Sequence, residues 1–337
     1  MSGTTQTSLH RYQRWSGRGG RPAATGGWLN IASTGVRWEY KRPATRNMVL
    51  VGLVFVCGAC PLFYVLSLAE ALAGTPQAQG IYDVLSTFLG VDLRGVARIG
   101  EFREVLWRSV FIVMIKWQLL WALIVVARVG PGLIANDLKA RALPIYFARP
   151  VTPLTYVLGK WMVAAAFIGF VVLVPNLLSL LLGVLITGGL HTWGQTLGLG
   201  LDLVICGLGV MVLGGIVVLA LSSLTSDSRY VTVGWLAVCL LPVMAQSIIH
   251  ESVDSVHTTG LLGSMSLQDD IVILTEWLFD MRGAWAATPL PAEAFERALS
   301  RPVEPMYPAL VLCAVTVVAA LVCYRRVVRF SRAAANV

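Results

Sequence analysis

Six apolar runs, each close to or above the length that crosses a bilayer, constrain the fold of this chain more than any other feature. A helix needs about 20 residues to cross about 30 Å of hydrocarbon. Hydrophobic residues make up 56% of the chain and Asp, Glu, Lys and Arg only 13%, which excludes a water-soluble globule of 337 residues. We therefore predict an all-α integral membrane protein, a bundle of six transmembrane helices. The predicted spans are Met48–Leu72, Val105–Ala127, Tyr156–Ile186, Leu199–Leu221, Val231–Ile249 and Pro308–Tyr324.

The Lys and Arg residues outside these runs predict the topology. With both termini in the cytoplasm, the inner segments hold seventeen of them and the outer segments six, as the positive-inside bias requires. The net charge of +8 is therefore a topology signal; we expect membrane lipid as a partner and no nucleic acid. The expected location is the cell's inner (plasma) membrane, as a multi-pass protein.

The segments around the spans have distinct compositions. Residues 1–27 are rich in Gly, Arg, Ser and Thr and are expected to be a mobile basic tail; residues 331–337 form a short C-terminal tail. Residues 28–47 mix aromatic, aliphatic and basic side chains, which predicts an amphipathic helix at the inner interface, before the six-span domain of residues 48–330. Gly35 and Pro43 interrupt this segment, so a disordered juxtamembrane linker is the alternative.

The large outer loop, residues 250–307, contains its own predicted helices. Ser266 with Asp269 three residues later is typical of a helix start, and apolar residues then recur at helical spacing. We expect an amphipathic helix on or dipping into the outer leaflet, and a short helix over Ala292–Ser300. No internal repeat is visible, which disfavours the repeat-built secondary transporters.

The inner loop between spans two and three, residues 128–155, is predicted to be a compact knob. Three prolines prevent a long helix, and we expect Asp137 and Arg141 to form an i,i+4 pair on a short one. The knob combines an apolar face with basic flanks, which suits docking into a groove of another protein. The face consists of Leu143, Ile145, Tyr146 and Phe147, and the flanks of Lys139, Arg141 and Arg149.

This loop resembles the signature of ABC-2-type permeases, the membrane subunits of ATP-binding-cassette transporters. The resemblance rests on Asp137, Arg141, the run Ala142–Tyr146, Arg149 with Pro150, and Tyr156–Lys160. It implies a coupling helix in the loop, a separate ATPase subunit as partner, and a second permease copy or paralogue. The implied ATPase-docking residues are Asp137, Arg141, Leu143, Pro144, Tyr146, Arg149 and Pro150, with Gly159 and Lys160 at the inner end of span three.

The chain has no G-x-x-x-x-G-K-[ST] phosphate-binding loop. We therefore expect no enzymatic activity of its own and no bound cofactor; ATP and Mg would belong to the partner subunit. Neither the His nor the Cys residues have a spacing that indicates a metal site. The resemblance implies that the chain is the permease subunit of an exporter-like transporter, and the apolar composition favours a hydrophobic or amphipathic substrate.

Polar residues within the spans are candidates for a translocation path or a dimer interface. Lys116 lies near the middle of span two, where an isolated cation is costly, and Glu70 and Asp202 are possible partners. Gln118 and Gln246 could add hydrogen bonds. The alternative is that Lys116 snorkels towards the outer headgroups. In span three, Pro175 is expected to kink the helix, with Asn176 bonding the freed backbone.

Two other functions fit parts of the sequence. The chain could be a scaffold subunit of an ATPase-linked complex that acts on an outer-face protein through the loop 250–307. An ion-driven transporter using Lys116 with Asp202 is less favoured, because it lacks the usual set of intramembrane carboxylates.

Overall fold

The computed structural model describes residues 27–72, 75–89, 103–147, 151–187, 193–252, 264–286 and 304–335, and all regular elements in these ranges are helices. The first half contains α1 (Gly27–Tyr40), α2 (Pro43–Gly52), α3 (Val54–Ala71), α4 (Gln77–Leu89), α5 (Arg103–Val129), α6 (Gly132–Lys139), α7 (Leu143–Phe147) and α8 (Pro153–Val171). The second half contains α9 (Leu173–Thr187), α10 (Trp193–Leu224), α11 (Ser228–Ser252), α12 (Leu267–Leu278), α13 (Met281–Ala286) and α15 (Met306–Ala335). The predicted tail 1–27 lies almost wholly outside the described residues, as does the predicted helix 292–300.

The prediction of six membrane spans is confirmed. Six helical segments of the described chain are long and apolar enough to cross a membrane. The second span is longer than predicted, because α6 follows α5 after a short turn. The segments cover 43–69, 103–139, 153–187, 196–224, 228–248 and 306–332.

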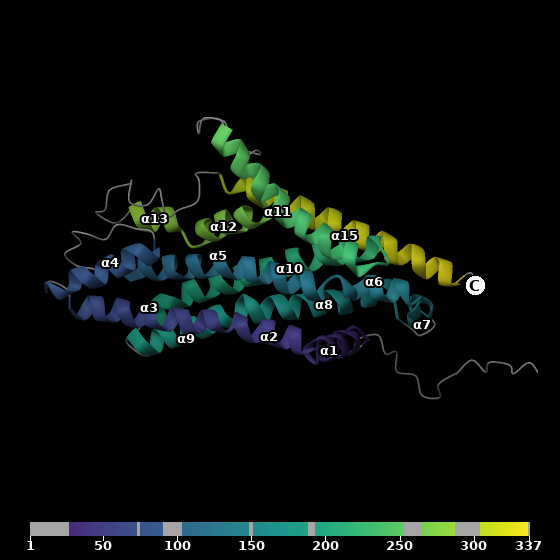
Figure 1. Ribbon diagram of the computed structural model, residues 1–337, viewed down its shortest axis with the longest axis horizontal. Coiled ribbons are helices and arrows are strands. Elements are labelled where there is room, and N and C mark those ends of the chain that lie inside the picture. Colours follow the sequence, from purple (N-terminus) through teal and green to yellow (C-terminus); the bar gives the residue numbers. More distant parts are fainter. Residues whose placement is uncertain are drawn as a thin grey trace, which may run out of the picture.

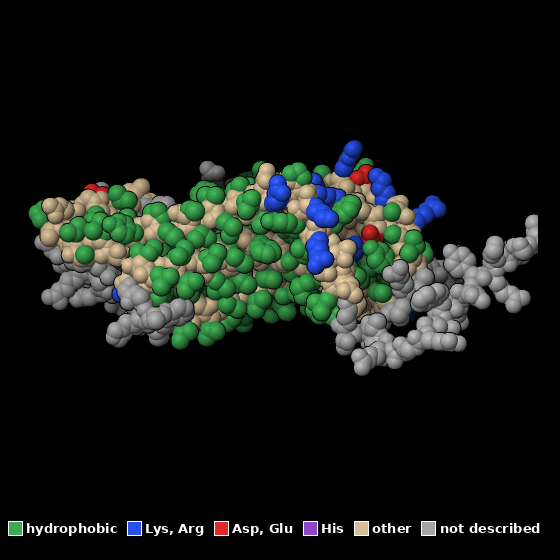
Figure 2. Space-filling model, turned by 90° about the horizontal axis from the view of Figure 1, so that it is seen from below, with side chains coloured by type: hydrophobic (Ala, Val, Ile, Leu, Met, Phe, Trp, Pro, Cys, Tyr) green, Lys and Arg blue, Asp and Glu red, His purple; other side chains and the backbone are tan. Residues whose placement is uncertain are grey.

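The helices run mostly along the long axis of the molecule (Figure 1). α1, α6, α7 and the C-terminal part of α15 lie at one end, whereas α4 and α13 lie at the other. Figure 2 shows Lys and Arg side chains concentrated towards the first end, with a broad apolar belt covering the middle of the molecule. We call this end the basic end.

The segment 28–47 is helical but is not one helix. α1 ends at Tyr40, and α2 begins at Pro43, in the first turn of a new helix, where its missing N–H costs nothing. Gly35 does not break α1. It allows close packing on α8, since a Cβ at Gly35 would lie 2.5 Å from Cγ2 of Val163. Residues 27–40 are thus helical in the structure.

The helix of span three is interrupted just before Pro175. α8 ends at Val171, and Val172 has φ −106° and ψ −59° before α9 begins. Pro175 has no N–H to bond the carbonyl of Val171. Asn176 does not bond that backbone, contrary to prediction: its Nδ2 donates to Oε1 of Gln118 on α5 at 2.8 Å, in the buried core. The kink is confirmed, but the predicted role of Asn176 is wrong.

The helices α4, α12 and α13 lie outside the predicted spans and away from the basic end (Figure 1). α4 was not predicted, although Ala78, Tyr82 and Leu85 recur at helical spacing and are buried. α12 begins as predicted, with Oγ of Ser266 accepting from N–H of Asp269 at 3.3 Å. α12 packs between α5, α10, α11 and α15, so it is part of the bundle and not a separate surface element.

Candidate functional site

The knob at the basic end is fixed to the bundle at the start of α6. Oγ of Ser222 on α10 accepts from the N–H groups of Ile134 and Ala135, both at 3.0 Å, and donates to the carbonyl of Pro131 at 2.9 Å. The first N–H groups of a helix have no intrahelical partner, so Ser222 takes the place of a capping side chain. Because Ser222 is fully buried, α6 and α10 are joined rigidly at this point.

The end of α6 turns the chain sharply into α7. The N–H of Ala142 donates to the carbonyl of Asp137 at 2.9 Å, and the N–H of Arg141 to the carbonyl of Leu138 at 3.1 Å. Together these bonds make a Schellman motif, which requires a left-handed residue. Arg141 takes that position with φ 51° and is exposed. The predicted i,i+4 pair on one helix is therefore wrong, because Arg141 lies beyond the last residue of α6.

Asp137 instead connects α6 to span three. Its Oδ2 lies 2.7 Å from Nζ of Lys160 and accepts from the hydroxyl of Tyr156 at 2.6 Å. All three side chains are largely withdrawn from solvent, and charge-assisted hydrogen bonds in such surroundings are strong. Asp137, Tyr156 and Lys160 thus join α6 to the first two turns of α8.

Aromatic contacts extend this connection into α7. The ring of Tyr146 lies 5.4 Å from that of Tyr156, and the ring of Phe147 lies 6.0 Å from it. Nζ of Lys160 lies 5.9 Å from the centre of the Tyr146 ring, within cation–π range. Burial raises the pKa of the Tyr146 hydroxyl, and the charge of Asp137 raises it further. α7 is therefore held against α8 by a continuous set of contacts, and it also packs against α15.

The apolar face of the knob is only partly exposed. Within the knob, Leu143 is buried, whereas Pro144 is exposed and Ile145 is 69% exposed. Arg149 and Pro150 lie outside the described residues. Gly159 lies against α1, where a Cβ would come 2.7 Å from Cβ of Ile31. Of the residues predicted to form a docking surface, Arg141 and Pro144 are exposed and Tyr146 is partly exposed. Asp137 and Leu143 are largely buried and do not contribute to the accessible surface.

The intramembrane Lys116 has a partner that spacing did not indicate. Its Nζ lies 3.4 Å from Oε1 of Glu276 on α12, a side chain that is 5% exposed. Of the two predicted partners, Asp202 on α10 interacts electrostatically with Arg108, and the side chain of Glu70 lies outside the described part. Arg108, two turns before Lys116 on α5, donates to the carbonyl of Phe279 just after α12 and pairs with Glu104. Two cations of α5 thus hold α12.

Gln118 has a hydrogen-bond partner that the sequence did not indicate. Gln118 is fully buried and its carbonyl oxygen accepts from Asn176, on a side of α5 away from Lys116's partner. Gln246 is buried on α11. Gln118 therefore joins α5 to α9.

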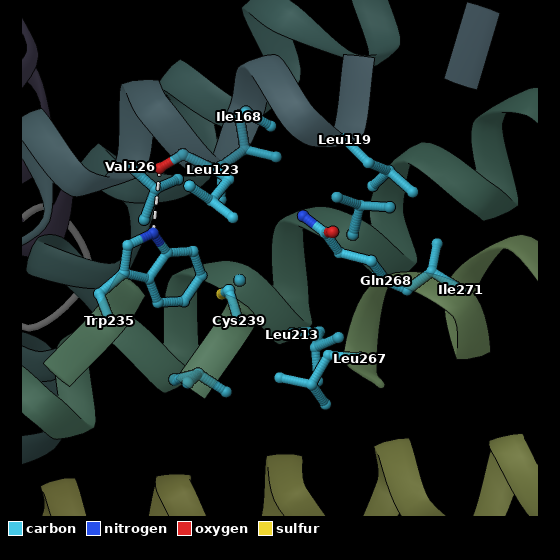
Figure 3. Close-up of a pocket in the computed structure, with 14 residues that line it drawn as sticks. Leu119, Leu123, Val126, Ile168, Leu213, Trp235, Cys239, Leu267, Gln268 and Ile271 are labelled. Carbon is cyan, nitrogen blue, oxygen red and sulfur yellow. Dashed lines mark hydrogen bonds between the residues drawn. The ribbon is translucent and has the colours of Figure 1, made fainter. Parts of the chain in front are cut away.

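Two apolar spaces lie around α12. Figure 3 shows one of them, a small cavity of about 50 Å³ between α5, α8, α10, α11 and the first turn of α12. The amide of Gln268 reaches into it, and the indole N–H of Trp235 donates to the carbonyl of Leu123 at 3.0 Å. The second is an apolar groove of about 600 Å³ between α10, α12 and α15, with Thr275 and Thr316 among its lining residues.

No model of a known protein family matches this chain, and no curated protein matches it. Among the described residues, no group of His, Cys, Asp and Glu could hold a metal ion. The fold defines the class: the chain is a multi-pass α-helical membrane protein with six membrane-spanning segments.

Proposed function

We propose that this chain is the permease subunit of an ABC-2-type transporter, with the basic end in the cytoplasm and α6–α7 as its coupling element. The observation that carries the proposal is a short helical knob that projects exposed Pro144 and Ile145 while being joined to three spans. A force applied to such a knob reaches α8 through Asp137 and Lys160, and α10 through Ser222.

The proposed mechanism uses these connections. ATP binding in a separate ATPase subunit would move the knob, and since α6 is hydrogen-bonded to α10 and ion-paired to α8, both spans would move with it. A coupling element needs such rigid attachment, because a knob on a flexible loop would absorb the motion. A second permease copy would supply the other half of the transport pathway, and ATP and Mg would bind to the ATPase subunits.

The surroundings of α12 support a hydrophobic or amphipathic substrate. The groove between α10, α12 and α15 is mostly apolar, and the cavity in Figure 3 has one amide among mostly apolar side chains that include Trp235 and Cys239. An ion would find no ring of carboxylates or carbonyls there. An exporter-like direction is part of this proposal.

The test is purification of the complex from its native membrane in mild detergent, followed by an ATPase assay in lipid. We expect an ATP-binding-cassette subunit in stoichiometric amount. Ile145→Arg should abolish substrate-stimulated hydrolysis without changing thermal stability, since Ile145 is 69% exposed. Leu29→Arg is the matched control, because Leu29 is 51% exposed at the same end but lies on α1. Purification of the chain without any ATPase, or equal effects of both variants, would overturn the proposal.

The alternative of a scaffold acting through the loop 250–307 gains no support from the described part of that loop. α12 and α13 are packed against α5, and α12 also contacts α10, α11 and α15. A helix that fills the bundle offers little surface to an outer-face protein.

A further inference from the structure

A cavity of about 400 Å³ with charged and apolar lining residues lies between α1 and the helices α6, α7 and α8 at the basic end. One wall is formed by α1 and the turn after it, and the opposite wall by α6 and α8. The polar side chains lining it include Asn30, Thr34, Glu39 and Arg42 on the first wall, Asn136, Asp137 and Lys160 on the second, and Tyr146 of α7. The lining also includes the apolar side chains of Ile31, Leu133 and Val163, so charged and apolar groups share this cavity.

The cations in the lining, Arg42 and Lys160, balance the carboxylates Glu39 and Asp137, and Arg128 nearby adds one positive charge. Glu39 pairs with Arg42 at 3.2 Å, and Asp137 pairs with Lys160 at 2.7 Å. Arg128 does not line the cavity, but its charge acts on the carboxyl of Glu39. Burial raises the pKa of Glu39, against the effect of Arg42, Arg128 and Lys160. Any protonation of Glu39 adds to the surplus, so an anion is favoured over a cation here.

The cavity lies where a membrane protein meets lipid headgroups. Trp38, which also lines it, is 64% exposed, and Leu29 on the same helix is 51% exposed. Exposed Trp beside Arg and Lys is typical of the membrane interface. Figure 2 shows Lys and Arg side chains next to the apolar belt on this side of the basic end. The anion available at this depth in every membrane is the phosphate of a phospholipid.

We propose that this cavity binds the headgroup of an anionic phospholipid. Arg42 and Lys160 supply the positive charge for its phosphate, and Thr34 and Asn136 supply neutral hydrogen bonds. The bound lipid would join α1 to α6 and α8, beside the knob. The proposal is independent of the transport function, because it requires only that the basic end lies at a membrane surface.

The test is native mass spectrometry of the full chain in detergent, titrated separately with phosphatidylglycerol and phosphatidylcholine. The wild type should retain phosphatidylglycerol at least fivefold more tightly than phosphatidylcholine. Arg42→Gln should remove most of this preference, whereas Lys41→Gln, the adjacent exposed cation that does not line the cavity, should change it less than twofold. Equal losses in both variants would show that general surface charge retains the lipid, and would overturn the proposal.

A second pair of variants does not depend on the Arg42–Glu39 ion pair. Thr34→Trp fills the cavity from an exposed position, and Ser33→Trp adds the same bulk on the same helix outside it. Only Thr34→Trp should lower phosphatidylglycerol retention, by at least fivefold. Equal retention in the two variants would overturn the cavity as the site. Displacement of the lipid by millimolar inorganic phosphate would identify a site for free phosphate and would also overturn the proposal.

Discussion

Nζ of Lys116 on α5 lies 3.4 Å from Oε1 of Glu276 on α12, and the carboxylate is 5% exposed while the lysine is 38% exposed. This pair joins the second span to a helix 160 residues later in the chain. Together with the bond from Arg108 to the carbonyl of Phe279, it fixes α12 along α5.

The first prediction follows from this unequal burial. Lys116→Met removes the cation from a buried carboxylate and should lower the stability on the order of 1 to 3 kcal/mol, below the range for fully buried pairs because Lys116 is partly exposed. Thermal unfolding in detergent measures the loss. The double variant Lys116→Met with Glu276→Leu should recover most of it, since the buried carboxylate is then removed together with its cation. A double variant that is no more stable than Lys116→Met would show that the pair does not carry the effect.

The second prediction concerns the serine between α10 and α6. Ser222→Ala removes three hydrogen bonds and leaves the N–H groups of Ile134 and Ala135 buried without this acceptor. A loss of about 1–3 kcal/mol is expected, measured by thermal unfolding. Ser223→Ala is the matched control: Ser223 is equally buried, but its hydroxyl bonds the carbonyl of Ala220 in its own helix. Equal losses in the two variants would contradict the capping role.

The third prediction isolates the backbone at Arg141. Its φ of 51° strains any residue that has a Cβ, and glycine adopts it freely. Arg141→Gly and Arg141→Ala both delete the exposed side chain, so their difference reports the backbone alone. The glycine variant should be more stable by about 1 kcal/mol, as measured by paired thermal melts. If the alanine variant were the more stable, α6 would not end in this left-handed turn.

The sequence predicted those features that depend on local pattern. Span lengths follow directly from apolar runs, and the start of α12 follows from a capping side chain, Ser266, that acts three residues ahead. α4 was not predicted, because it is too short and too polar to form a long apolar run. Its one buried face is nevertheless marked in the sequence by the helical spacing of Tyr82 and Leu85.

Partners between distant segments could not be predicted in this way. Nothing in the spacing distinguishes Glu276 from the other carboxylates as the partner of Lys116, because the choice depends on how α12 packs against α5. The pair between Asp137 and Arg141 was predicted wrongly for a local reason: i,i+4 pairing holds only while the helix continues, and α6 ends two residues before Arg141. The bond from Asp137 to Lys160 depends instead on the packing of α6 against α8.

The fourth prediction is a pH dependence that originates at Glu39. Burial raises the pKa of this carboxyl above 4.5 in the folded protein, and the opposing cations Arg42, Arg128 and Lys160 reduce the shift without reversing it. Between pH 4.5 and the raised pKa, the folded state therefore holds more protons than the unfolded state, and the free energy of unfolding falls as the pH rises. Above the raised pKa, Glu39 is ionised in both states, and the free energy of unfolding no longer changes with pH through this group.

Glu39→Gln removes this titration and keeps the shape of the side chain. The stability of the variant relative to the wild type should therefore increase from pH 4.5 upwards and then reach a plateau, in thermal melts at fixed ionic strength. Glu304→Gln, at an exposed carboxylate just before α15, is the control for general effects of removing one negative charge. If Glu39→Gln instead lost stability relative to the wild type as the pH rose, the ion pair with Arg42 would outweigh the cost of burial, and Glu39 would be held ionised at the rim of the cavity.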